Sequence, residues 1–380
     1  MRGQAAVDPN IRYATSCDGV RIAYAVMGKG TPVVRASHWL THLEYELNSP
    51  VWRHLIILGM ASRHTLVRYD GRGTGLSQRD AVEISLDRWV DDLACIVDCL
   101  SLERFVLLGV SQGGAISIKY AARHPERVSH LIIHGAYARG FLHRDNPDKQ
   151  RQFVELNRAL IREGWGSEHD AYRQWFTSQF IPGGTAEQSR WFNDLERVSA
   201  TPEMMERFVI EMSTINIADL LPQVKAPTLV THCTGDVRVP FALGQEIAAG
   251  IPGAKFVPLD SRNHNFLAHE PATRIFFDAV ASFLGDPPFR GALPGTTTFK
   301  ERAQRRIAAL ERNCSRRPCR RDDLVSAAYA PAPPVRLSRV SASTLRHCAL
   351  MPASPMTLPH FAVSVRNRAA QSSGVLATGS

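Results

Sequence analysis

The chain has 380 residues, of which 44% are hydrophobic and 21% charged, which is ordinary for a soluble globular protein able to build a core. Residues 285–380 hold 15 basic and five acidic side chains, so this segment carries +10 and residues 1–284 carry −1 of the net charge of +9. For the part expected to fold, charge therefore excludes the strongly basic surface on which an argument for nucleic-acid binding would rest.

Short β-rich runs alternate with helical patterns along the first 135 residues, which predicts an α/β fold with a mostly parallel central sheet flanked by helices. Strands are expected at Arg21–Met27, Pro32–Ala36, His64–Tyr69, Arg104–Val110 and Val128–His134. Helices are expected at Trp52–Ala61, Leu86–Leu100 and Gln112–Arg123. The run before Val110 is almost wholly apolar, as expected of a strand buried on both faces.

Residues 139–219 show one helical pattern after another and no convincing strand. The alternation then resumes, with strands expected at Pro227–His232 and Lys255–Leu259 and helices at Phe241–Ala249 and Thr273–Leu284. A helical block inserted into an α/β alternation is typical of a lid over a site. We therefore expect an α/β core at residues 11–138 and 220–284, with a helical lid at 139–219.

The last segment, residues 285–380, is a basic, low-complexity tail that contains ten of the 23 prolines. Apart from one helical stretch at Lys300–Arg312 it lacks periodicity, and we expect it to be largely disordered. Two origins compete. Either the tail is a genuine extension, or a reading-frame shift near Lys300 has replaced a DNA-binding domain, and the abrupt change in composition favours the shift.

The seven cysteines are irregularly spaced in a chain too long to need disulfides, which predicts reduced thiols. Residues 1–10 lack the apolar stretch of a signal peptide, and no apolar run approaches the roughly 18 residues of a membrane-spanning helix. We therefore expect a cytoplasmic protein with no membrane partner. The sequence leaves the oligomeric state open.

The motif Gly109-Val-Ser-Gln-Gly113 fits the pattern G-x-S-x-G, and it lies between a buried strand and a helix. This is the context of a nucleophile elbow, in which a serine occupies a strained turn and small residues on both sides let strand and helix approach each other. The alternative is a glycine-rich turn with an incidental serine. The context favours Ser111 as a catalytic nucleophile.

A serine hydroxyl is a weak nucleophile that needs a base, and the base needs an orienting acid. Asp236 follows the strand ending at His232, and His264 follows the next strand, so both fall on the sheet edge that carries Ser111. We predict that His264 is the base and Asp236 the acid. His269 is the competing base, and Asp260 is a reserve acid.

The negative oxygen of a tetrahedral intermediate needs hydrogen-bond donors. One is expected from the backbone N–H of Gln112, directly after the nucleophile. The second is expected from the loop after the Pro32–Ala36 strand, from Trp39 or Leu40. Trp39 stands where a smaller residue would make an easier turn.

The glycine-rich segment Asp70–Gly75 lacks the ending of a phosphate-binding P-loop and is interpreted as a structural loop. Asp91 and Asp92 on the following helix are expected on a solvated face, and Cys95 and Cys99 in the core. No cluster of histidines, cysteines or carboxylates has metal-ligand spacing. We therefore expect neither a metal nor another cofactor.

Together these features resemble the α/β-hydrolase superfamily over residues 11–284. The matching motifs are the elbow, the loop Asp70–Ser77, the helix exit His124–Val128, the acid loop Asp236–Pro240, and His264. More narrowly, Ser37–Glu46 and Ser111–Gly114 resemble hydrolase modules of bacterial regulators that are joined to a LuxR-type DNA-binding domain or a nucleotide cyclase. The usual His-Gly-x oxyanion sequence is replaced by His38-Trp39-Leu40.

Two functions of different classes follow from these observations. The first is a cofactor-free serine hydrolase of an ester, thioester or similar small-molecule acyl substrate, in which Ser111 attacks, His264 relays the proton and Asp236 holds the imidazole. The second is a small-molecule-sensing module of a transcriptional or signalling regulator whose DNA-binding domain is missing. The complete set of three residues favours the first, the regulator resemblance favours the second, and the two are compatible.

Overall fold

The computed structural model describes residues 10–53, 59–81, 83–167 and 169–288. Half of the helix expected at Trp52–Ala61 lies outside these residues, and so does the segment after Pro288. The predictions of a disordered tail and of a reading-frame shift near Lys300 therefore fall outside the described part of the chain.

The described residues form an eight-stranded sheet with the order β1-β2-β4-β3-β5-β6-β7-β8. The strands are β1 (Arg12–Thr15), β2 (Arg21–Met27), β3 (Pro32–Arg35), β4 (Thr65–Tyr69), β5 (Phe105–Val110), β6 (Val128–His134), β7 (Thr228–Cys233) and β8 (Lys255–Leu259). Two pairs of neighbouring strands, β1 with β2 and β2 with β4, are antiparallel. The other neighbouring strands are parallel. The predicted mostly parallel sheet is confirmed, whereas the short edge strand β1 had not been predicted.

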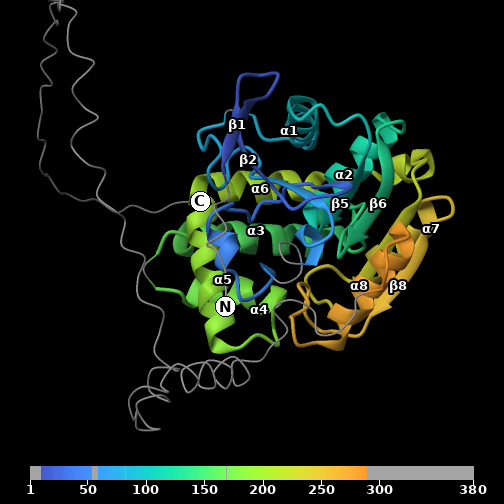
Figure 1. The fold of residues 1–380 in the computed structure, drawn as a ribbon. Coiled ribbons are helices and arrows are strands. Elements are labelled where there is room, and N and C mark those ends of the chain that lie inside the picture. The colour runs from blue at the N-terminus through green and yellow to red at the C-terminus, as the bar shows by residue number, and fades with distance from the viewer. Residues whose placement is uncertain (1–9, 54–58, 82, 168, 289–380) are drawn as a thin grey trace, which may run out of the picture. The chain divides into compact units, whose positions relative to one another are not determined.

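Helices cover both faces of this sheet (Figure 1). They are α1 (Leu86–Cys99), α2 (Gln112–Arg123), α7 (Phe241–Gly250) and α8 (Pro271–Leu284). Phe105 of β5 packs against Tyr120 of α2, whereas Leu108 lines a pocket with Phe276 of α8. Because residues three apart in a strand point to opposite sides, α2 and α8 lie on opposite faces. The predicted α/β architecture with flanking helices is therefore confirmed.

Four described α-helices lie between β6 and β7, and we call this segment the helical insert (green shades in Figure 1). They are α3 (Pro147–Gly164), α4 (Ala171–Phe180), α5 (Ala186–Ser199) and α6 (Pro202–Thr214). The start of α5 is fixed by a capping box in which the side chains of Thr185 and Gln188 satisfy each other's backbone N–H groups. A bridge between Arg139 and Asn216 brings the two ends of the insert together.

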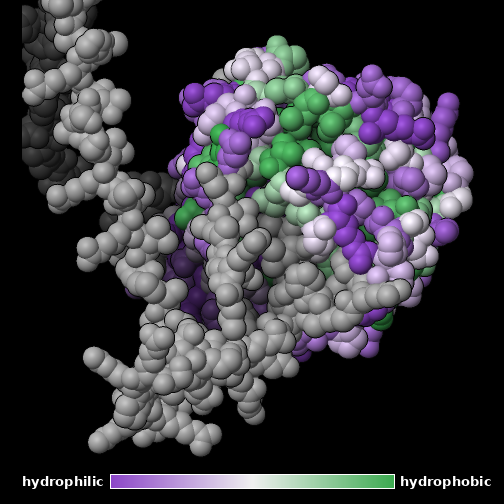
Figure 2. All heavy atoms as spheres, viewed as in Figure 1, coloured by the Kyte–Doolittle hydropathy of each residue, from purple (hydrophilic) through white to green (hydrophobic). Residues whose placement is uncertain are grey.

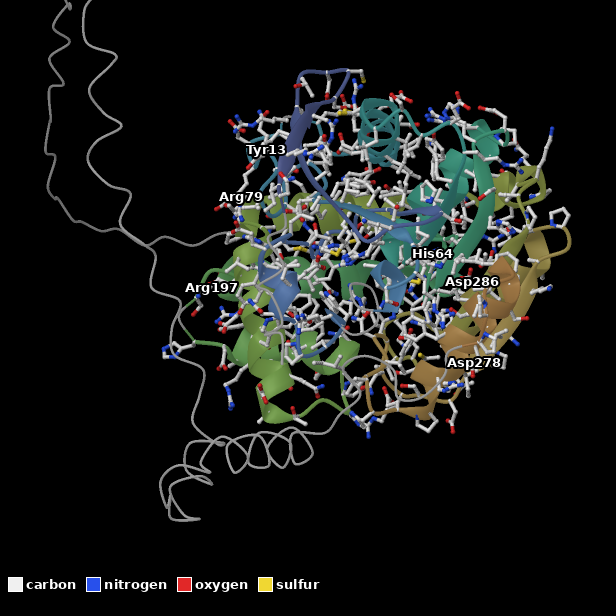
Figure 3. All side chains as sticks on the ribbon, in the orientation of Figure 1. Tyr13, His64, Arg79, Arg197, Asp278 and Asp286 are labelled. Atoms are coloured by element: carbon white, nitrogen blue, oxygen red, sulfur yellow. The ribbon has the colours of Figure 1, made fainter. Side chains whose placement is uncertain are left out.

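The chain after α8 is tied back to the sheet domain. Gly285 ends α8 with a φ of 74°, a left-handed conformation that favours glycine. Asp286 then pairs with His64 at 2.9 Å, just before β4, and the two side chains lie next to each other in Figure 3. The described packing thus extends a few residues past the last helix.

The structure corrects the expectation that Asp92 lies on a solvated face. Asp92 is fully buried and its Oδ1 lies 2.7 Å from Nη2 of Arg72, a guanidinium that also pairs with Asp18 at 2.6 Å. Its neighbour Asp91 does lie at the surface, where it pairs with Arg88. The different burial of Asp91 and Asp92 could not be predicted from the sequence, because Arg72, the partner of Asp92, lies 20 residues away in the chain.

A second correction concerns Cys99, which is exposed, whereas Cys95 is half-buried against the core.

On the face drawn in Figure 2, hydrophilic side chains surround scattered hydrophobic areas. No helix in the described ranges has the length and apolar character needed to cross a membrane.

Asp92→Ala is expected to lower the free energy of unfolding by about 3 kcal/mol, because it leaves the buried Arg72 with one carboxylate fewer. Asp91→Ala is the matched control and should cost less than about 1 kcal/mol, as is usual for exposed ion pairs. Urea denaturation of the two variants measures both values. Equal losses would contradict the assignment of Asp92 to a buried ion pair.

Truncation after Pro288 is expected to leave the melting temperature within about 2 °C of the full chain, a change of less than about 1 kcal/mol. The reason is that the sheet, its flanking helices and the Asp286 ion pair all lie before the cut. Differential scanning calorimetry of both chains provides the test. A clearly lower melting temperature would show that the tail contributes to folding.

Candidate active site

Ser111 occupies a strained turn between β5 and α2, with φ 53° and ψ −125°. This turn brings β5 and α2 close together, which requires a small residue at Gly109. A Cβ on Gly109 would lie 2.6 Å from Ser117 Oγ and 2.7 Å from Gly114 Cα, so no larger residue fits there. The backbone N–H of Ser111 donates to the carbonyl of His134 at 2.9 Å, which fastens the turn to the neighbouring strand β6.

The side chains of His264 and Asp236 are joined by a hydrogen bond of 2.6 Å between Nδ1 and Oδ2. The other oxygen of Asp236 accepts the backbone N–H groups of Arg238 and Val239, each at 2.9 Å. Burial raises the pKa of Asp236, but the charge and hydrogen bond of His264 together with these N–H groups outweigh it, so the pKa lies below its usual value. Asp236 is therefore ionised and fixes the orientation of the imidazole.

Ser111 and His264 line the same pocket. Nε2 of His264 is buried and has no hydrogen-bond partner among the described residues. The structure thus brings together the three predicted residues, with one ring nitrogen held by Asp236 and the other unengaged. The competing residues His269 and Asp260 are both exposed and do not line this pocket.

Three supporting residues were not found from the sequence. Nε2 of the buried His134 lies 3.2 Å from the carbonyl of His264, and burial lowers the pKa of His134 to about 3, so it is a neutral donor. Nε2 of His232 donates to the carbonyl of Val239 at 2.8 Å and so holds the acid loop. Gly135 has a φ of 57°, and a Cβ there would lie 3.1 Å from Cε1 of His264. The sequence signal that could have identified two of them is the position of His134 and His232 at the ends of predicted strands.

The predicted oxyanion donors differ in their availability. Gln112 begins α2, where the first N–H groups of a helix have no partner within the helix. The side-chain Oε1 of Gln112 accepts a hydrogen bond from the backbone N–H of Trp39 at 2.8 Å. The N–H of Trp39 therefore already has an acceptor. The backbone N of Leu40 lies 3.3 Å from Nδ1 of His38, which also lines the pocket.

The protonation of His38 decides whether Leu40 is engaged as well. Nε2 of His38 lies 2.6 Å from Nη2 of Arg35, and a guanidinium can only donate. Burial and the nearby Arg35 hold the pKa of His38 well below its usual value, so the ring is neutral and carries its proton on Nδ1. A protonated Nδ1 cannot accept from Leu40. The N–H of Leu40 is therefore left without an acceptor on this ring.

A buried group of charges supports the loop that carries His38. Glu46 binds Arg35 at 3.1 Å and Arg68 at 2.7 Å, and all three side chains are at most 2% exposed. Asp70 adds a second anchor, since its Oδ2 accepts the backbone N–H of Leu43 at 3.1 Å. These contacts agree with a structural role for the loop that begins at Asp70.

Among the described residues, no group of three or more histidine, cysteine, aspartate or glutamate side chains is placed to hold a metal ion.

A family model described as alpha/beta hydrolase fold matches residues 45–270, which is more than half of the chain. The AB hydrolase superfamily protein YisY of Bacillus subtilis is 29% identical, covering 68% of this chain and 94% of that protein. The putative carbamate hydrolase RutD of Azorhizobium caulinodans is 28% identical, covering 69% and 94%. The structure of an esterase from Exiguobacterium antarcticum has a TM-score of 0.61 and 23% identity, covering 72% of this chain and 99% of its own, and this likeness shows the fold alone.

Gly135→Ala is expected to disturb the hydrogen bond between His264 and Asp236, because the added Cβ must push the imidazole ring aside. Proton NMR detects this change, since the proton of a short Nδ1–H···O bond resonates far downfield. Gly253→Ala is the matched control: its φ is also positive, at 71°, but a Cβ there meets nothing within 4 Å. A downfield signal that is unchanged in Gly135→Ala would contradict the expected contact.

Proposed function

The chain belongs to the α/β-hydrolase family, and on that premise we propose that it is a serine hydrolase that cleaves an ester, thioester or related acyl bond. One observation carries the proposal. His264 has one ring nitrogen bonded to Asp236 and the other unengaged in the pocket that Ser111 lines. One relative is named an AB hydrolase superfamily protein and the other a putative carbamate hydrolase, and these names support a hydrolase function.

In the proposed reaction, Oγ of Ser111 attacks the carbonyl carbon while Nε2 of His264 takes the hydroxyl proton. Asp236 stabilises the imidazolium that forms, because its carboxylate is ionised and lies 2.6 Å from Nδ1. His264 then gives the proton to the leaving group. Water then attacks the carbonyl carbon of the acyl-enzyme while Nε2 of His264 takes a proton from it. His264 returns this proton to Oγ of Ser111, which releases the acid and restores the enzyme.

The oxyanion of the tetrahedral intermediate is assigned to the backbone N–H groups of Gln112 and Leu40. Gln112 follows the nucleophile directly, as in a nucleophile elbow. Leu40 is preferred to Trp39 because the N–H of Trp39 already donates to the side chain of Gln112. Arg35 is a positioning residue in this proposal, since it fixes the tautomer of His38 that leaves Leu40 free.

The helical insert is proposed to act as the lid that selects the substrate. Its residue Phe180 packs 5.4 Å from the His264 ring and 5.6 Å from Trp39, measured between ring centroids. Val209 and Met212 of α6 also line a pocket beside Ser111. Residues 139–219 thus decide which acyl and leaving groups fit.

Ser111→Ala is expected to abolish fluorophosphonate labelling and to lower the rate of p-nitrophenyl butyrate hydrolysis by at least about 10³-fold, since the change removes only the attacking oxygen. His264→Ala should lose activity to within about tenfold of the same level, because these residues act as a unit. Ser178→Ala, at an exposed serine of α4, is the matched control.

Gel-based labelling and a spectrophotometric assay on the same preparations give both readouts. Undiminished labelling of Ser111→Ala would exclude this residue as the nucleophile. The ligand-sensing alternative predicts a different pattern, in which wild-type protein binds small molecules but neither labels nor turns over.

A further inference from the structure

Ser111 and Trp39 also line a second pocket, which does not include His264. Two arginines, Arg144 and Arg238, line this second pocket together with apolar side chains of the helical insert. We call it the arginine pocket. Two guanidinium groups beside a nucleophile are a distinctive feature, because charged side chains are seldom buried without partners.

The groups that contact the two arginines are mostly uncharged. Arg238 is 9% exposed, donates from Nη1 to Gln179 at 3.0 Å, and has its guanidinium 5.2 Å from the centre of the Phe180 ring. The half-buried Arg144 donates from Nε to a backbone carbonyl at 3.1 Å and lies 4.3 Å from the centre of the Phe141 ring. Within the described residues, neither guanidinium has a carboxylate within ion-pair distance.

The nearby acids do not neutralise these charges. Asp236 is bound to His264, and Glu246 pairs with Arg139 at 3.0 Å. Burial raises the pKa of Glu196 well above its usual range, which favours the neutral form of this side chain. Burial lowers the pKa of Arg238 to about 10, which still leaves it charged at neutral pH.

Two positive charges therefore meet in the arginine pocket, and neither forms an ion pair with a carboxylate of the described residues. Burying a charge without a partner is strongly unfavourable, and the aromatic contacts offset only part of this. An anionic group on a bound molecule would supply the missing partner. The planar guanidinium matches a carboxylate well, because the two groups can form a pair of parallel hydrogen bonds.

We propose that the substrate carries a free carboxylate on its acyl part, bound in the arginine pocket by Arg238 and Arg144. This inference rests on the proposed serine hydrolase function. The acyl part is assigned to this pocket because the histidine must protonate the leaving group, which therefore occupies the pocket that contains His264. The substrate class is thus a half-ester, or related half-acyl derivative, of a small dicarboxylic acid.

The test compares p-nitrophenyl hydrogen glutarate with its methyl ester, which has the same acyl chain without the charge. Wild-type protein is expected to favour the charged probe in kcat/KM by at least about tenfold, the factor contributed by one charge-assisted hydrogen bond. Arg238→Met and Arg144→Met should each lower this ratio by about tenfold. Arg151→Met, at an exposed position of α3 where the guanidinium pairs with Asp148, should leave the ratio unchanged.

Arg238→Lys keeps the charge and should retain part of the preference, which separates loss of charge from loss of folding. A wild-type preference for the neutral probe, or a preference that survives in both methionine variants, would overturn the inference while leaving the hydrolase function standing. Absence of turnover and of fluorophosphonate labelling would instead refute the hydrolase function.

A binding measurement decides the inference even without turnover. Calorimetry on Ser111→Ala should show binding of glutarate that Arg238→Met abolishes in the same background. Binding of inorganic phosphate as tight as that of glutarate, or no glutarate binding at all, would overturn the assignment of a carboxylate.

Discussion

The left-handed turn at Ser111 is the constraint on which the rest of the site depends. It exists because Gly109 lets α2 approach β5 to a distance that any Cβ would block. Its N–H is held by the carbonyl of His134 at the end of β6, and β7 pairs with β6, so the loop carrying Asp236 is brought to the same edge of the sheet. The half-buried Ser111, the imidazole and the carboxylate lie at this edge because the strand order and the elbow are compatible.

Charge organises the surroundings of this turn. On one side, Glu46 joins two buried arginines, and Arg35 determines which nitrogen of His38 carries the proton. On the other side, the loop that orients Asp236 through its backbone N–H groups also places the side chain of Arg238 in the second pocket. The same seven-residue loop from Thr234 to Pro240 thus links the proposed proton relay to the proposed recognition of substrate.

The sequence predicted the strands, the flanking helices and the three residues of the proposed relay, because apolar runs and the elbow pattern are local signals. It did not predict that Asp92 is buried, since that depends on Arg72 from another loop. It gave no reason to single out Arg238 or Gly135, whose importance comes from what folds against them. The regulator resemblance, the cytoplasmic location and the origin of the tail stay predictions.

Mapping the site of covalent modification by tandem mass spectrometry tests the central claim most directly. Wild-type protein is treated with a fluorophosphonate, digested, and examined for the modified peptide. A single adduct per chain is expected, on Ser111, because this serine lines the pocket that also contains His264, whose Nε2 is unengaged. An adduct on another residue, or none at all, would contradict the central claim.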